Sequence, residues 1–207
     1  LTPEKLTLAR ELIQEIRAGQ TVYDVLKRHP LADGSMISKA VLVAAYQKMV
    51  TDGSIIEDRD LLAKIRMKPV RTLSGVTTVT VLTKPYPCPG KCIFCPDDVR
   101  MPKSYLPDEP GAMRALDHNF DPYTQVRSRI NALHALGHPT DKIELLILGG
   151  TWSSYKKDYQ EWFIKRCFDA MNHNTDDEDL GAPDLVTAQT INENAKHRNV
   201  GLVIETR

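Results

Sequence analysis

Apolar residues recur every three or four positions along the first 67 residues, a spacing that predicts short amphipathic helices. The first helix has Thr2 as its N-cap and Pro3 at its first helical position, and it ends before Gly19. Further helices are predicted over residues 22–28, 38–53 and 59–66. We interpret residues 1–69 as a small helical N-terminal module, an arrangement that many functions share.

From about residue 70 the pattern changes to strands alternating with helices. Residues 76–82 are rich in β-branched side chains and lie between Gly75 and Pro85, which predicts a strand. Residues 145–148 and 201–204 are apolar, and buried strands are predicted over 145–148 and 201–205, the first of them buried on both faces. Helices are predicted over residues 122–136, 157–171 and 187–197, and a loop over residues 96–110.

This alternation favours βαβ units and a parallel sheet, and therefore an α/β fold for residues 70–207. The carboxyl ends of parallel strands gather at one edge of a sheet, where ligands bind. That edge is expected to carry the cysteine loop, the Gly149–Thr151 turn and the Glu205–Arg207 segment. Because three strands cover one another poorly, we expect the front portion of a longer protein.

Overall composition gives no argument for a nucleic acid or a membrane as partner. Lys and Arg number 27 and Asp and Glu number 27, so global charge gives no argument for a nucleic acid or a membrane. No stretch approaches the roughly 20 apolar residues that span a membrane. The segment after Leu1 is amphipathic and resembles neither a signal nor a transit peptide, so we expect a trimmed chain.

The cysteines are unevenly distributed. Cys88, Cys92 and Cys95 lie within eight residues, whereas Cys167 lies alone in a predicted helix. Secreted scaffolds spread their cysteines in pairs, so this pattern indicates a cytoplasmic protein with a metal site and one buried thiol. Three thiolates can hold three irons of a [4Fe–4S] cluster and leave the fourth open. The alternative is structural zinc, which normally needs a fourth Cys or His nearby, and none follows.

The cysteine spacing, with Phe94 before the third cysteine, resembles the cluster motif of radical S-adenosylmethionine enzymes. In that motif the open iron binds the amino and carboxylate groups of the cofactor. Gly149 and Gly150 let the backbone approach a ligand closely, so with Thr151 and Glu205 they are candidate contacts for S-adenosylmethionine. A simple turn at the two glycines and a surface carboxylate at Glu205 stay open as alternatives.

Positive charge is concentrated locally although the total is zero. No acidic residue occurs between Asp60 and Asp97, and basic residues continue beyond the cysteine loop. Such density suits a phosphate backbone, and it favours an RNA surface over the alternative of a solvated positive face. The candidate tRNA-binding residues are Lys64, Arg66, Lys68, Arg71, Arg114 and Arg127.

A set of short segments occurs in the order expected of one family. They are Val70–Gly75, Lys84–Pro85, the three cysteines, Glu109–Pro110, Met113–Ala115, Asp121–Tyr123, Gln125–Arg127, Arg129, Leu136–His138, Asp141–Lys142, Gly149–Thr151 and Ile204–Arg207. Together they resemble the catalytic subunit of Elongator, the tRNA wobble-uridine carboxymethylating family, in its stand-alone bacterial or archaeal form. The short gap between the first two cysteines is typical of that form.

The resemblance implies a radical S-adenosylmethionine domain built as a partial (β/α) barrel, joined to an acetyltransferase domain of the GNAT type. It implies an acyltransferase that carboxymethylates C5 of the wobble uridine of tRNA, with acetyl-CoA and S-adenosylmethionine as co-substrates. By position, Cys88, Cys92 and Cys95 would hold the [4Fe–4S] cluster and Lys142 would contact acetyl-CoA. The acetyltransferase domain and the rest of the barrel are absent, so these residues alone are expected to be inactive.

Other functions remain open from the sequence. Another radical S-adenosylmethionine reaction on RNA, such as methylthiolation, would need a second cluster, for which only Cys167 remains. A tRNA-binding module with a purely structural cluster would bind RNA without cleaving the cofactor. A protein acetyltransferase role would depend on the absent domain. The choice of tRNA and any self-association or larger assembly are undetermined.

Overall fold

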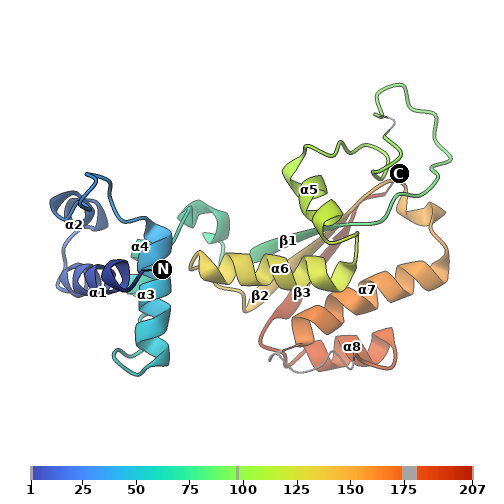
Figure 1. Ribbon diagram of the computed structural model, residues 1–207. Coiled ribbons are helices and arrows are strands. Elements are labelled where there is room, and N and C mark those ends of the chain that lie inside the picture. The colour runs from blue at the N-terminus through green and yellow to red at the C-terminus, as the bar shows by residue number, and fades with distance from the viewer. Residues whose placement is uncertain (1, 97, 174–180, 207) are drawn as a thin grey trace. The chain divides into compact units, whose positions relative to one another are not determined.

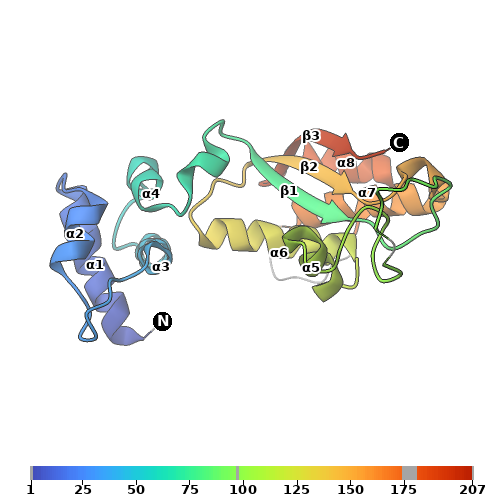
Figure 2. The same ribbon diagram turned by 90° about the horizontal axis from the view of Figure 1, so that it is seen from above.

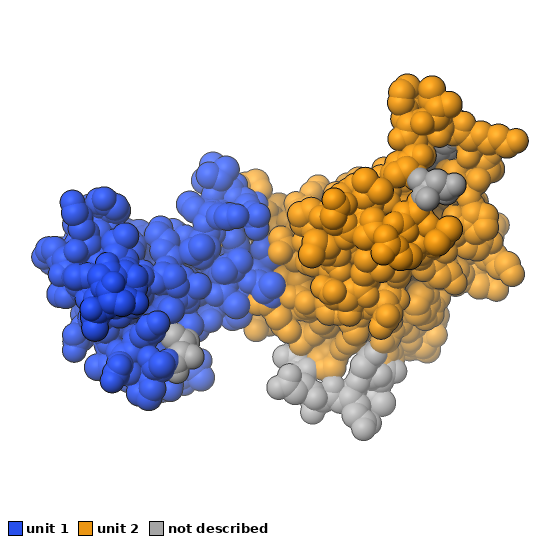
Figure 3. Space-filling view, turned by 45° about the horizontal axis from the view of Figure 1, so that its top comes forward, with its two compact units in different colours: residues 1–73, 132–138 blue, residues 74–131, 139–207 orange. Residues whose placement is uncertain are grey.

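The computed structural model describes residues 2–96, 98–173 and 181–206, and these form two compact units. One unit comprises residues 1–73 and 132–138, and the other residues 74–131 and 139–207, as coloured in Figure 3. The assignment of residues 1–69 as a separate domain stays a prediction. No helix among the described residues has the length and apolarity to cross a membrane.

The first unit is helical, as its periodicity predicts (Figure 1). Its elements are α1 (Pro3–Arg17), α2 (Val22–Arg28), α3 (Lys39–Thr51), α4 (Arg59–Ile65) and the 3-10 turn η1 (Pro69–Thr72). Thr2 caps α1 by accepting a hydrogen bond from the backbone N–H of Lys5, which confirms the predicted start. Leu12, Ile13 and Leu42 are fully buried in its core, and each contributes about 1.5–3 kcal/mol through burial.

The second unit contains the predicted parallel sheet, in the order β1 (Thr77–Leu82), β2 (Lys142–Leu148) and β3 (Arg198–Ile204). The chain order of these strands and their parallel pairing confirm the α/β class. Helices α6 (Pro122–Ala135), α7 (Lys157–Asn172) and α8 (Leu185–Asn192) connect the strands. Figure 2 shows the three strands side by side, with α6 running beside them. The partial (β/α) barrel remains an expectation.

Burial differs from what continuous apolar runs predict. In β2, Ile143, Leu145 and Ile147 are buried, while Leu146 and Leu148, on the opposite face, are only half-buried. In β3, Val200, Leu202 and Val203 are 49%, 39% and 45% exposed. The prediction of a third buried strand was therefore wrong for this structure. Edge position alone does not explain this, because β1 also pairs only with β2; Ala112 and Ala115 pack on Leu82 of β1, whereas the β3 side chains have no comparable cover among the described residues.

Two elements begin or end where the sequence did not place them. Helix α5 (Pro110–Asp117) lies where only the end of a loop was predicted, and its apolar side packs on Leu82. Helix α8 ends at Asn192, five residues before the predicted end. The side chain of Asn192 donates to the carbonyl of His197 and accepts from the N–H of Asn199, which turns the chain toward β3.

Candidate cofactor site at the carboxyl edge of the sheet

The three strands end at one edge, where their following residues contact one another. The N–H of Thr83, after β1, donates to the carbonyl of Leu148 at 3.0 Å. The N–H of Glu205, after β3, donates to the carbonyl of Ile147 at 2.9 Å. Parallel pairing thus brings together the three segments that the sequence assigned to this edge. The 207th residue, part of the third segment, lies outside the described residues.

Gly149 turns the chain sharply after β2. Its φ is +143°, a conformation that L side chains rarely adopt, and a Cβ atom added there would overlap the hydroxyl of Thr83. Its N–H donates to Glu205 Oε2 at 3.2 Å, and Thr151 two residues later is buried. This backbone path is possible only for glycine at position 149, and it places Glu205 against the turn.

Tyr105 is a residue of this edge that the sequence did not single out. Its hydroxyl donates to Glu205 Oε2 at 2.6 Å, so Glu205 is held from two sides. Burial and the hydrogen bond to Glu205 raise the pKa of Tyr105 far above its ordinary range, so the phenol stays protonated as a donor. Tyr105 lies in an irregular proline-rich loop, where no periodicity could have identified it.

Two of the cysteines lie beside hydroxyl groups of other segments. Cys88 Sγ is 3.1 Å from Thr151 Oγ1, and Cys95 Sγ is 3.3 Å from Ser104 Oγ, while Cys92 is exposed. Among the residues described, no three His, Cys, Asp or Glu side chains are gathered closely enough to hold a metal ion. The cysteines therefore share one loop at the sheet edge without forming a closed ligand set, and cluster binding stays a prediction.

The donor set nevertheless fits an iron–sulfur cluster chemically. Three thiols lie within eight residues of one irregular loop, and hydroxyl donors beside Sγ atoms stabilise the thiolate form. The fourth cysteine, Cys167, is fully buried in α7, as predicted, and burial raises the pKa of its thiol. Three ligands without Cys167 would leave one iron open.

Comparison with known proteins identifies relatives along the whole chain. A tRNA uridine(34) acetyltransferase of Methanocaldococcus jannaschii is 44% identical over 97% of this chain, and that of Methanocaldococcus infernus is 44% identical over 99%. Elongator complex protein 3 of Schizosaccharomyces pombe is 34% identical over 98% of the chain. The chain is a homologue of these proteins. It spans 35%, 36% and 39% of their respective lengths.

The other comparisons add little to this homology. A solved structure of the Methanocaldococcus infernus protein, Elp3 with N-terminal residues 1–46 deleted, matches 64% of this chain and 23% of its own. That match has a TM-score of 0.46 at 44% identity. No protein-family model matches the chain.

In this homologue of Elongator complex protein 3, tyrosines of α7 and its preceding turn support the edge. The hydroxyl of Tyr155 donates to the carbonyl of Lys84 at 2.7 Å and shares a hydrogen bond of 2.8 Å with Thr83. Its ring stacks between those of Tyr86 and Tyr159, at centroid distances of 4.8 and 5.1 Å. This stack fixes the segment from which the cysteine loop departs.

Lys142, the predicted acetyl-CoA contact, lies elsewhere in this homologue of Elongator complex protein 3. It is the first residue of β2 and pairs with Arg198, whereas Gly149 follows the last residue of the strand. Seven residues of strand separate them by about 20 Å. Lys142 is exposed at the amino edge of the sheet and does not belong to the group of residues around Glu205.

The predicted tRNA-binding residues are divided between the two units. Lys64, Lys68 and Arg71 are exposed in the first unit, whereas Arg66 donates to Thr72 Oγ1 at 3.0 Å. Arg114 and Arg127 belong to the second unit, and Arg127 donates to the carbonyl of His173 at 2.7 Å. Arg66 and Arg127 are therefore each hydrogen-bonded within the protein already, and a tRNA phosphate would have to share the side chain with that bond.

Proposed function

We propose that this homologue of Elongator complex protein 3 is a tRNA-modifying enzyme of the radical S-adenosylmethionine class. Its reaction is carboxymethylation of C5 of the wobble uridine, with acetyl-CoA as the carbon source. The relatives named tRNA uridine(34) acetyltransferase support a modification at that nucleotide. Since the chain spans about a third of their length, we expect these 207 residues alone not to complete the reaction.

The observation that carries the proposal is the junction of three separate segments at the sheet edge. Cys88, from the loop after β1, lies 3.1 Å from Thr151 after β2. Glu205, after β3, accepts from Gly149 in the same β2 turn. A cluster held by the cysteines and a cofactor lying on the glycine turn would thus be neighbours.

Each residue has a role that its chemistry allows. Cys88, Cys92 and Cys95 would hold a [4Fe–4S] cluster, which when bound supplies the electron that cleaves S-adenosylmethionine. Gly149 and Gly150 present backbone without side-chain obstruction, and Glu205 offers a carboxylate to amino or ribose hydroxyl groups. Thr151 and Ser104 would donate hydrogen bonds to ligating sulfurs.

The roles of the two co-substrates rest on homology and charge. The exposed Lys64, Lys68 and Arg71, with Arg114, would contact tRNA phosphates. Lys142 would contact acetyl-CoA at the opposite edge of the sheet, so that contact would be distant from the cluster in this unit.

Anaerobic reconstitution with iron and sulfide tests the proposal directly. The chain should bind about four irons and four sulfides, and the C88A/C92A/C95A variant should bind none. A C167A variant, which alters only the buried cysteine, should bind as the unaltered chain does. Deoxyadenosine release would then be measured on the full-length protein. Absence of cluster uptake under these conditions overturns the proposal.

A second candidate is a tRNA-binding module in which the metal is structural. The exposed basic residues of the first unit favour it, because they bind phosphate without any catalysis. It predicts salt-dependent tRNA binding, zinc uptake in place of iron and no cleavage of S-adenosylmethionine. Zinc analysis and the deoxyadenosine measurement distinguish the two.

A further inference from the structure

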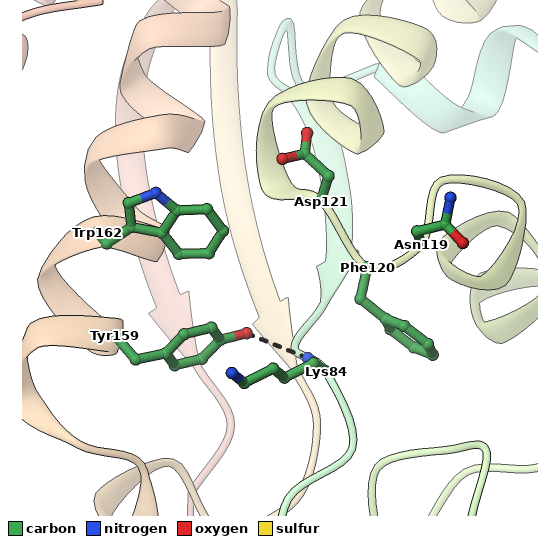
Figure 4. Close-up of a pocket in the computed structure, with 6 residues that line it drawn as sticks. All are labelled: Lys84, Asn119, Phe120, Asp121, Tyr159 and Trp162. Atoms are coloured by element: carbon green, nitrogen blue, oxygen red, sulfur yellow. Dashed lines mark hydrogen bonds between the residues drawn. The ribbon is translucent and has the colours of Figure 1, made fainter.

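A pocket of about 370 Å³ opens in the second unit, apart from the cysteine loop. Three segments form it: Lys84 after β1, the turn Asn119–Asp121 before α6, and Tyr159 with Trp162 on α7. Figure 4 shows the two α7 rings facing the turn across the open space. None of these six residues is among the candidate binding residues predicted from the sequence.

The α7 wall of the pocket is an aromatic surface with a cation on it. The rings of Tyr159 and Trp162 lie 5.6 Å apart, and 43% of Trp162 is exposed. The Lys84 ammonium lies 4.6 Å from the centre of the Tyr159 ring, and the backbone N–H of Lys84 donates to the Tyr159 hydroxyl at 3.1 Å. An exposed indole beside a cation suits a flat π system attached to a negative charge.

The opposite wall is a strained turn that supplies polar groups. Asn119 and Phe120 have φ values of +50° and +57°, and the N–H of Phe120 donates to the carbonyl of Ala115 at 2.7 Å. The turn thereby places Asn119, Phe120 and Asp121 along one side of the pocket. One oxygen of Asp121 accepts from the N–H of Thr124 at 2.7 Å, which leaves the second oxygen as an acceptor.

We propose that this pocket binds an unpaired nucleobase of an RNA, stacked on Trp162 with its phosphate at Lys84. A carboxylate beside the ring repels a phosphate but accepts from an amino group, so Asp121 selects a base with an exocyclic amino group. Uracil lacks that group and binds more weakly. This inference rests on the proposed function, in that an RNA is the partner.

A free nucleotide offers the same ring chemistry, but the pocket favours a nucleotide within a strand. Lys84 is the single cation among the six lining residues, and both Lys84 and Trp162 are exposed. A mononucleotide would gain little beyond one stacking contact, whereas a strand gains further phosphate contacts on either side.

Trp162 fluorescence provides the test. The chain has two tryptophans, so a W152F background leaves Trp162 as the reporter. Titration with oligoadenylate and oligocytidylate should quench this fluorescence, with tighter binding than oligouridylate, and adenosine monophosphate should bind at least 10-fold more weakly than oligoadenylate. Equal affinity for the three oligonucleotides, or tighter binding of the mononucleotide, overturns the proposal.

Variants separate the contacts, with oligonucleotide affinity measured by fluorescence anisotropy of a labelled strand. W162A should weaken binding about 5- to 100-fold and W162F much less, because a phenyl ring still stacks. D121N keeps a good N-cap but should abolish the preference for amino bases. K84Q should weaken all sequences alike and lower the salt slope by about one. E161A, on the same helix outside the pocket, should bind as the unaltered chain does.

Binding by the pocket needs no cluster, so its failure and the failure of the proposed function are distinguishable. Oligonucleotide binding that is unaffected by W162A, in a chain that takes up iron and keeps its circular dichroism, overturns the pocket alone. Loss of iron uptake with intact base-selective quenching overturns the radical enzyme alone.

Discussion

Gly149 lies so close to Thr83 that a Cβ atom on Gly149 would overlap the Thr83 hydroxyl oxygen. The two residues follow neighbouring strands, β2 and β1, and Thr83 also donates its N–H to the carbonyl of Leu148. Position 149 therefore requires glycine for two independent reasons, the positive φ and the lack of space for a side chain. Neither reason applies to Gly150, where the atoms nearest to an added Cβ, both of Lys103, are 3.7 Å away.

A Gly149→Ala substitution should destabilise the protein by roughly 2–4 kcal/mol, because the strain in φ and the clash add. Gly150→Ala is the matched control and should change the free energy of unfolding by less than about 0.5 kcal/mol. Urea denaturation followed by circular dichroism measures both. Equal stability of the two variants would show that the turn relaxes freely.

Gln125 of α6 is buried and bonds to both backbone groups of Leu82, donating to its carbonyl at 3.0 Å and accepting from its N–H at 2.9 Å. Gln125→Met conserves volume but leaves both groups unpaired, and should cost about 2–4 kcal/mol. Asn131→Ala, exposed on the same helix, should be nearly neutral. If Gln125→Met leaves the free energy of unfolding unchanged in thermal and urea denaturation, water replaces the amide as the partner of Leu82.

Asp169 is a buried carboxylate that accepts from Lys165 at 2.8 Å, Arg166 at 3.3 Å and the N–H of Ala182 at 3.0 Å. Asp169→Asn keeps the shape but places an uncharged amide against two cations, with an expected loss of about 2–3 kcal/mol. Glu161→Gln on the same helix is the control, and urea denaturation compares the two. A loss of stability no larger than that of Glu161→Gln would show that solvent screens the charges around Asp169.

Alkaline pH should destabilise the protein through buried phenols. Burial is the main cause that raises the pKa of Tyr105, Tyr155 and Tyr159. The unfolded phenols ionise near pH 10, so above that pH the unfolded state binds fewer protons and stability falls as pH rises. Below about pH 9 this contribution is fully present. Urea denaturation at pH 8 to 11 measures it, and Tyr159→Phe should make the fall shallower.

The cysteines should differ sharply in reactivity. Cys92 is exposed and Cys167 is fully buried, and burial also raises the pKa of the Cys167 thiol. In the native protein without a cluster, iodoacetamide should modify Cys92 quickly and leave Cys167 unmodified at pH 8, as peptide mass spectrometry can measure. Modification of Cys167 at the rate of Cys92 would contradict the described packing of α7.

Local signals along the chain were sufficient for much of the fold. The cap at Thr2 predicts the start of α1, and the β-branched run predicts β1, because both depend on contacts within a few residues. Alternation of strands and helices also predicted that the glycine turn and Glu205 would meet, since parallel strands end at one edge. The sequence does not predict helix α5, because Pro110 fits the end of a proline-rich loop as well as the start of a helix.

Other features depended on contacts between distant residues. Tyr105 donates a hydrogen bond to Glu205, which is 100 positions later in the chain. Trp162 and Asn119 line one pocket that is built from three segments. The exposure of β3 depended on which side chains other elements cover, and apolar composition does not contain that information. Sequence by itself determined most of the elements, the parallel pairing of the strands and the cysteine loop, because propensity and periodicity are local. Tertiary structure alone decided which side chains hold Glu205 and which residues form the pocket, because those contacts exist only after the strands pair.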